Sequence, residues 1–294
     1  MEFLHTLLAI LWNAFTQTLG IALAFFGIML LLGLMMYLLA RFTRNLFAKS
    51  LGPRAELFIT AWVGTPVHEM GHAVFCLIFG HRITKVRLFT PNSRDGSLGM
   101  VEHTYNRRNL YQRAGGFFIG AGPVIFGSLV ILALLYLLVP NGHLIAGSSG
   151  RNAALLQQEG ISIVQYSGMV LSEFGNLVRM LFSQTNLSSW QFWIFLYLVL
   201  AIASHMELSP PDISQMLNGL LVILMLIFAV SLFYAVFFPS AGNFLYAATP
   251  FIGSLNQLLF LALMFSVINF VLTFVLLSIP LLIFRRSIVN PFNR

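Results

Sequence analysis

Residues 68–72 read His-Glu-Met-Gly-His and lie inside an apolar stretch, residues 57–80, that is long enough to cross a bilayer as a helix. Residues four apart share one face of a helix, so the imidazoles of His68 and His72 can hold one Zn²⁺. Glu69 lies close enough to that face to take a proton from water at the metal. The stretch therefore predicts a membrane helix that carries part of a zinc site.

An alternative is that these polar residues only hold membrane helices together through hydrogen bonds. Ionisable groups at membrane depth are costly, however, and they usually mark a functional site. The chain has only seven histidines, and charged residues make up 9% of it. Two histidines and a glutamate at this spacing therefore favour a metal site.

The composition is typical of a membrane protein with several spans, because hydrophobic residues make up 58% of the 294 and 29 residues are Phe. The net charge of +7 does not predict a nucleic-acid partner, since the basic residues cluster in short loops where lipid headgroups account for them. No Lys or Arg precedes Arg41, so a cleaved signal peptide is not expected. The single cysteine, Cys76, excludes an intramolecular disulfide and any zinc cluster built on cysteines, and it is expected only to pack within its helix.

The apolar segments predict an all-α polytopic membrane protein with about six transmembrane helices, each needing about 20 residues. We expect one integral membrane domain over residues 1–294, with its core at 55–220. The predicted helices cover residues 18–40, 55–80, 115–139, 190–204, 216–238 and 251–284.

Two shorter features lie between these helices. Residues 83–89 and 99–105 flank a turn-rich segment and predict a small membrane-associated β-hairpin after the second helix, with a basic loop lying on headgroups as the alternative. Between the third and fourth helices, apolar residues recur at helical spacing and predict an amphipathic helix lying in the membrane interface. These apolar residues are Met169, Val170, Phe174, Leu177, Val178, Leu181 and Phe182.

Basic residues give an expected orientation. With six crossings, ten Lys and Arg fall on the side of the hairpin and both termini, against six on the other side. Because cytoplasmic loops carry the excess of positive charge, both termini and the hairpin are expected in the cytoplasm, in a multi-pass protein of the cell's inner or plasma membrane.

A catalytic zinc site needs a third protein ligand. The chain has two Asp residues, and Asp95 is most simply a turn former. Asp212 follows two prolines that break a helix at membrane depth, where an unpaired carboxylate is expensive, so it is our candidate. His205 and Glu207 are competing candidates.

At this point the chain resembles the site-2 protease family of intramembrane zinc metalloproteases. That family carries the H-E-x-x-H motif on one membrane helix, a Gly-Pro element on the next, and a third ligand from an Asp preceded by proline. Residues 68–72, 120–123 (Gly-Ala-Gly-Pro) and Pro211-Asp212 match in order. Ile213 and Gly127 depart from the family, which usually has Gly and Asn there.

The resemblance implies hydrolysis of peptide bonds in or near transmembrane helices of membrane-protein substrates, with Zn²⁺ held by His68, His72 and Asp212 and Glu69 as the general base. The lipid bilayer is the second partner. No insert is long enough for a PDZ domain, so gating is expected from residues 141–189, the hairpin or a regulatory membrane protein.

Three other classes compete with this interpretation. A CAAX-processing membrane protease takes its third ligand from a Glu-x-x-x-Asp helix, but Glu207 and Asp212 are five apart and prolines intervene. A catalytically silent relative that binds membrane helices has no need of Glu69. A metal-ion transporter is expected to repeat His or Asp across its spans, which this chain does not.

Overall fold

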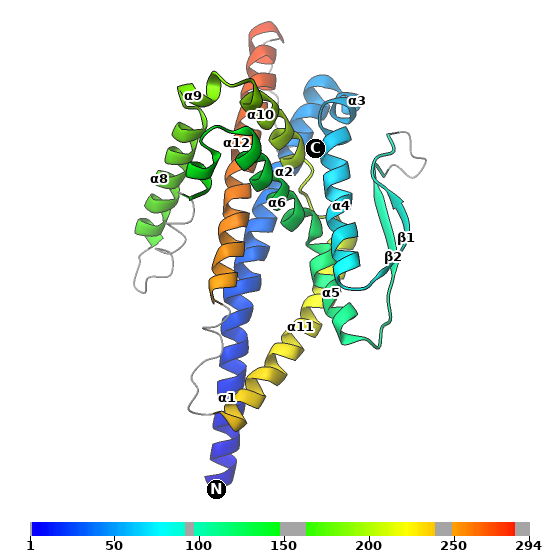
Figure 1. The fold of residues 1–294 in the computed structure, drawn as a ribbon, viewed down its shortest axis with the longest axis vertical. Coiled ribbons are helices and arrows are strands. Elements are labelled where there is room, and N and C mark those ends of the chain that lie inside the picture. Colours follow the sequence, from blue (N-terminus) through cyan, green and yellow to red (C-terminus); the bar gives the residue numbers. More distant parts are fainter. Residues whose placement is uncertain (1, 92–96, 148–162, 239–248, 286–294) are drawn as a thin grey trace.

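The computed structural model describes residues 2–91, 97–147, 163–238 and 249–285, which are mostly helical with one small sheet (Figure 1). The chain begins with one long helix that joins α1 (Glu2–Ile21), a π-helical turn η1 (Ala22–Gly27) and α2 (Ile28–Leu51). Its apolar part, Leu4–Leu51, has 48 residues. At 1.5 Å per residue this is about 70 Å, which is more than twice the thickness of a bilayer core.

A tight turn at Gly52, whose φ is +88°, sends the chain back alongside this helix. Three helical segments follow without interruption: α3 (Pro53–Glu56), the π-helical η2 (Leu57–Ala61) and α4 (Trp62–Ile78). Glycine tolerates the positive φ, and Pro53 suits the first helical position because it has no N–H to leave unsatisfied. The predicted metal helix, residues 57–80, therefore corresponds to η2 and α4.

The predicted β-hairpin is confirmed as a two-stranded antiparallel sheet of β1 (Arg82–Arg87) and β2 (Met100–Thr104). It lies beside α4 (Figure 1). Two helices follow, α5 (Leu110–Gly120) and α6 (Gly122–Leu138), and they meet at an angle of 59°. The side chain of Asn109 caps α5 by accepting bonds from the N–H groups of Tyr111 and Gln112.

The remaining described elements are α8 (Ile163–Leu181), α9 (Gln184–Leu187), α10 (Trp190–Ala203), α11 (Pro210–Phe237) and α12 (Thr249–Arg285). The predicted amphipathic helix is present as α8, which buries Leu177 and Leu181. Its place in the membrane interface stays a prediction. The long α12 packs against α2, and its Phe265 meets Phe195 of α10 edge to face in the apolar core.

Three helices in the described part of the chain are long and apolar enough to cross a membrane, or four if the bent α5–α6 pair is one span. These are the first long helix, α11 and the part of α12 from Gly253 to Leu281. The structure is thus that of an all-α membrane protein with a small sheet.

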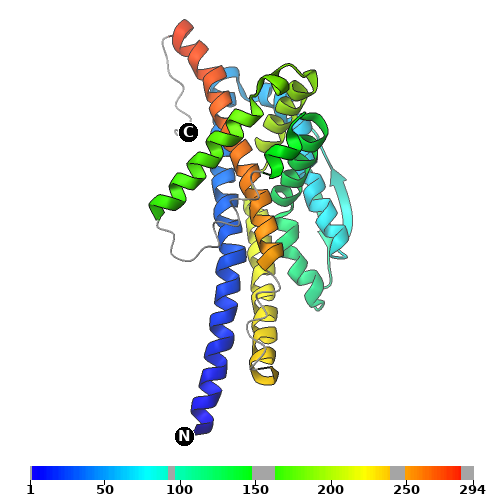
Figure 2. The ribbon, with the colours of Figure 1, turned by 60° about the vertical axis from the view of Figure 1, so that its left-hand side comes forward.

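The two helices α10 and α11 run in the same direction (Figures 1 and 2). The chain entering α10 meets the end of α6, where Asn186 donates to Asn141, and the chain leaving α10 places Met206 against Gly127 near the start of α6. Likewise α11 is antiparallel to α5, since Asp212 lies at Gly120 and Gly219 lies at Phe117. Thus α10 runs antiparallel to α6, and α11 runs antiparallel to α5.

This direction does not support the expectation that the fourth and fifth predicted spans cross the membrane separately. The start of α1 and the end of α12 lie at opposite ends of the molecule (Figure 1). With the termini on opposite sides, the hairpin side carries seven Lys and Arg and the other side nine. The charge bias then no longer places the hairpin in the cytoplasm.

Candidate metal centre

The side chains of His68, His72 and Asp212 come together where α4 meets the first turn of α11. The two Nε2 atoms are 3.3 Å apart, and Asp212 Oδ1 is 3.3 Å from Nε2 of His72. Asp212 Oδ2 is 4.0 Å from Nε2 of His68. His72 and Asp212 are buried and His68 is half-buried. The structure therefore brings the third candidate ligand to the two histidines of the motif.

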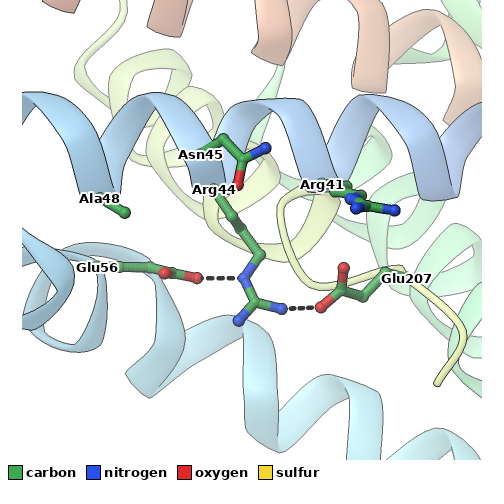
Figure 3. Close-up of a pocket in the computed structure, with 6 residues that line it drawn as sticks. All are labelled: Arg41, Arg44, Asn45, Ala48, Glu56 and Glu207. Atoms are coloured by element: carbon green, nitrogen blue, oxygen red, sulfur yellow. Dashed lines mark ion pairs between the residues drawn. The ribbon is translucent and has the colours of Figure 1, made fainter. Parts of the chain in front are cut away.

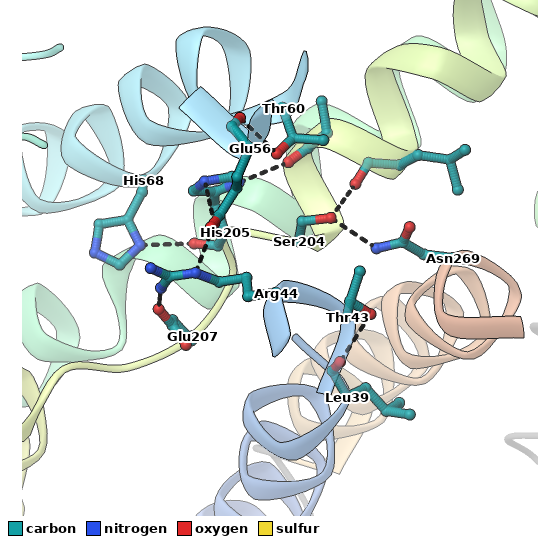
Figure 4. A network of polar contacts seen from close by, with 12 residues as sticks. Leu39, Thr43, Arg44, Glu56, Thr60, His68, Ser204, His205, Glu207 and Asn269 are labelled. Atoms are coloured by element: carbon teal, nitrogen blue, oxygen red, sulfur yellow. Dashed lines mark hydrogen bonds and ion pairs between the residues drawn. The ribbon is translucent and has the colours of Figure 1, made fainter. Parts of the chain in front are cut away.

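Both imidazole rings are fixed by main-chain carbonyl groups. Nδ1 of His68 lies 2.8 Å from the oxygen of His205 (Figure 4), and Nδ1 of His72 lies 2.8 Å from the oxygen of Ile119. A carbonyl oxygen only accepts, so each Nδ1 carries a proton, and in the neutral ring Nε2 then presents its lone pair to the centre. This is the support that metal-binding histidines usually have.

Breaks in the helices explain why these two carbonyl groups are available. In an α-helix the Ile119 oxygen would accept from the N–H of residue 123, but Pro123 has none. The His205 oxygen belongs to the link between α10 and α11, and the N–H of Ser209, four residues on, is bonded to Asp212 instead. Each break in a helix therefore supplies one acceptor to one histidine.

Asp212 is held by a capping box at the start of α11. Its Oδ2 accepts from the N–H of Ser209 at 2.8 Å and from the Ser209 hydroxyl at 2.6 Å. The sequence argument assumed that this carboxylate has no partner without a metal, and that premise is wrong, because the cap and the helix N-terminus stabilise it. Metal binding by Asp212 is instead favoured by the location of its second carboxylate oxygen. The cap uses Oδ2 and leaves Oδ1 3.3 Å from Nε2 of His72.

The distances fit the size of a zinc ion. Zinc bonds to nitrogen or oxygen of 2.0–2.2 Å in a tetrahedron put neighbouring ligand atoms about 3.3–3.5 Å apart. The separations from His72 Nε2 to His68 Nε2 and to Asp212 Oδ1 are both 3.3 Å. Three acceptor atoms with no proton between them repel one another, and a shared cation removes that repulsion. The donor set of two imidazoles and one carboxylate is a common one for catalytic zinc.

The glycines of the Gly-Ala-Gly-Pro element allow the helices to approach closely enough to form the centre. A Cβ on Gly71 would come within 2.7 Å of the backbone of Gly122, so α4 and the α5–α6 bend are in backbone contact between the two histidines. On the other side, a Cβ on Gly120 would meet the main-chain oxygen of Asp212. The backbone of the Gly-Ala-Gly-Pro element thus lies directly between α4 and the start of α11, in contact with both.

Glu69 is buried beside the centre and beneath the hairpin. A Cβ on Gly99, just before β2, would lie 2.5 Å from Cγ of Glu69 and 2.7 Å from its Oε1. The helical spacing places Glu69 about 60° around α4 from His72. The hairpin therefore covers the carboxylate that the sequence predicts as the base.

The competing ligands His205 and Glu207 belong to a different polar group, which Figure 4 shows. The His205 ring lies with Nδ1 3.1 Å from the oxygen of Ala201 and Nε2 3.7 Å from Glu56. Arg44 of α2 pairs with Glu56 at 2.6 Å and also with Glu207. Asp95, the other aspartate, is outside the described residues.

Sequence reasoning missed the role of Arg44, which it counted only as a basic residue near a membrane surface. Arg44, Glu56 and Glu207 line a pocket of about 190 Å³ together with Arg41, Asn45 and Ala48 (Figure 3). The ion pairs tie α2 and α3 to the link whose His205 carbonyl orients His68. The sequence did contain one indication of this pairing. Asp and Glu total only nine residues, so acidic side chains such as Glu56 and Glu207 are expected to have basic partners.

No family model, curated protein or solved structure matches this chain.

Proposed function

We propose that this protein is an intramembrane zinc metalloendopeptidase that hydrolyses peptide bonds in or near the transmembrane helices of other membrane proteins, as its resemblance to the site-2 protease family implies. The observation that carries the proposal is the convergence of two Nε2 atoms and one carboxylate oxygen, each with a free lone pair, beside Glu69. A centre built only to hold helices together has no need of the buried glutamate.

Different residues of the chain would bind the metal and transfer the proton. His68, His72 and Asp212 would hold the ion, and a Zn²⁺ bound there would lower the pKa of water and polarise a peptide carbonyl. The Glu69 carboxylate takes a proton from the attacking water and returns it to the leaving amine. Gly99 lies against the Glu69 side chain, so the hairpin limits where this carboxylate can move.

The hairpin suits a substrate that must be unwound. A helical substrate hides its carbonyl groups in hydrogen bonds, so a segment has to become extended before attack. In the two-stranded sheet, β2 pairs with β1 along only one edge. A substrate strand added along β2, next to Glu69, would be held extended by main-chain bonds.

The proposed setting is the bilayer of a cell's inner or plasma membrane. We place five crossings in it: the first long helix, α4, the α5–α6 pair, the α10–α11 pair and α12. The breaks in the two pairs then lie against protein at membrane depth, which is where irregular backbone is tolerated. A membrane protein partner that gates access belongs to this proposal.

The deciding experiment compares wild type with Glu69→Gln in cells, followed by mass spectrometry of the N-termini of all membrane proteins. We expect new N-termini within or beside transmembrane segments for wild type and none for Glu69→Gln, since an amide cannot take the proton. Purified Glu69→Gln should still hold about one Zn²⁺ at this centre. His143→Ala, an exposed histidine away from the centre, is the matched control.

Two results would refute the proposal. One is the same set of new N-termini in wild type and Glu69→Gln. The other is undiminished zinc in the double variant His68→Ala, His72→Ala, because removing two of three ligands should abolish binding.

A further inference from the structure

A second group of ligand atoms lies one helical turn along α4 from the first. Cys76 Sγ and one ring nitrogen each of His81 and His103 all lie within 4.8 Å of one another. Nδ1 of His81 is 3.0 Å from Nδ1 of His103. Cys76 and His81 are buried and His103 is half-buried. The sequence predicted that Cys76 only packs within its helix, and this neighbourhood gives it a second role.

The end of α4 brings His81 to Cys76. Gly80 adopts a φ of +67°, and the N–H of His81 donates to the Cys76 oxygen at 2.8 Å. This is the hydrogen bond of a Schellman turn, in which the chain folds back over the last turn of its helix. A non-glycine residue would be strained at this φ, so the turn depends on Gly80.

The hairpin brings His103 to the same place from a distant part of the chain. His103 is on β2 opposite Ile83 of β1, and its side chain points toward the helices. Its Nε2 lies 3.1 Å from the side-chain amide of Gln215, which is on α11 one turn beyond Asp212. The group thus joins α4, the hairpin and α11.

The His81 ring is oriented by a main-chain carbonyl group, as the rings of the first centre are. Nε2 of His81 lies 2.8 Å from the Gln112 carbonyl oxygen, so it carries the proton and Nδ1 presents a lone pair. The atom of Gln215 placed 3.1 Å from Nε2 of His103 is the amide nitrogen. The two ends of an amide group are interchangeable assignments, and metal binding by Nδ1 of His103 requires the amide oxygen there, so that Nε2 carries the proton and both Nδ1 lone pairs face each other beside the thiol.

We propose that Cys76, His81 and His103 bind a second Zn²⁺ ion, which fastens the hairpin to α4 and, through Gln215, to the helix that carries Asp212. One thiolate and two imidazoles are a ligand set that zinc prefers over harder cations such as Mg²⁺ and Ca²⁺. The ion would lock the strand that covers Glu69, so this site is structural and adds no reacting group.

Cobalt distinguishes this site from the first one, because Cys76 is the only thiol in the chain. Co²⁺ is added to the full-length, metal-stripped protein in detergent micelles. We expect near-ultraviolet thiolate-to-Co²⁺ charge-transfer absorption whose final intensity corresponds to one thiolate-bound Co²⁺ per chain, since the first centre also takes up Co²⁺ but has no thiolate, and this absorption should disappear when Zn²⁺ is added. It should vanish in Cys76→Ser and persist in the double variant His68→Ala, His72→Ala.

Two further variants separate a metal site from a packing effect. His103→Gln should abolish the absorption, and Gln215→Ala should weaken Co²⁺ affinity by about tenfold to a hundredfold, as expected for a residue that only orients a ligand. His143→Ala should leave it unchanged.

The proposal is overturned if wild type shows no charge-transfer absorption. In that case His103 Nδ1–H donates to His81, and Gln112, His81, His103 and Gln215 form only a chain of hydrogen bonds. It is also overturned if Cys76→Ser retains the absorption. Neither result bears on the first centre, whose failure appears as undiminished zinc in the His68 and His72 double variant.

Discussion

His72 donates its Nδ1 proton to the carbonyl oxygen of Ile119, 2.8 Å away, and Ile119 is the residue whose helical hydrogen bond Pro123 cannot make. A proline that bends one helix therefore orients a ligand on another. This relationship gives the Gly-Ala-Gly-Pro element a physical role: its glycines allow close approach and its proline frees an acceptor.

Pro123→Ala should weaken zinc binding at the first centre. The new N–H competes with His72 for the Ile119 oxygen, and loss of such support typically costs about tenfold to a hundredfold in metal affinity. Competition with a chelator measures it. Pro280→Ala, which changes a proline inside α12, is the control and should bind zinc as wild type does. Equal affinity in the two variants would contradict the role given to Pro123.

Asp212→Asn should release zinc and stop cleavage, because an amide oxygen is a much poorer donor to Zn²⁺ than a carboxylate. The same change at Asp95 should do little. His205→Ala keeps the main-chain carbonyl that holds His68, so we expect it to retain zinc. If metal analysis shows zinc lost from His205→Ala but kept in Asp212→Asn, the third ligand has been assigned to the wrong residue.

Gly99→Ala should slow cleavage while leaving zinc in place. The added methyl group would lie 2.5 Å from Cγ of Glu69, so the carboxylate or the hairpin must move. Displacing a catalytic group by about 1 Å can cost about a hundredfold in rate. Gly168→Ala, where nothing lies within 4 Å of the new atom, is the control. Wild-type cleavage by Gly99→Ala would show that the hairpin does not position Glu69.

Arg44→Gln should destabilise the protein more than Arg41→Gln, although both residues line the same pocket. The change leaves Glu56 and Glu207 without their arginine, and charged hydrogen bonds at a half-exposed position contribute about 1–2 kcal/mol. Thermal unfolding in detergent measures the difference. Adding Glu56→Gln to Arg44→Gln should recover part of the loss. Equal unfolding temperatures for Arg44→Gln and Arg41→Gln would show that the Arg44 ion pairs do not stabilise the protein.

Tags fused before Met1 and after Arg294 should be accessible from opposite sides of the membrane. The basis is that α10 and α11 run in one direction, and the five crossings proposed above place the two termini on opposite sides (Figure 1). Antibody labelling of intact and permeabilised cells reads this out directly. Labelling of both tags from the same side would restore the arrangement of six separate crossings.

The sequence by itself determined the local features of this protein. Apolar length predicted the helices, alternation with a turn predicted the hairpin, and the four-residue spacing of His68 and His72 placed both rings on one helix face. It also singled out Asp212, because a carboxylate after two prolines is unusual at membrane depth. All of these follow from short-range geometry, which a stretch of 5 to 25 residues fixes whatever lies around it.

Only the tertiary structure decided how these pieces meet. Apolar length does not encode direction, so the sequence could not reveal that α10 and α11 continue one path. The pairing of Arg44 with Glu56 and Glu207, and the meeting of Cys76 with His103, depend on contacts between segments far apart in the chain. Such contacts are set by packing of whole helices, through close approaches such as Gly71 on Gly122, and no local pattern specifies them.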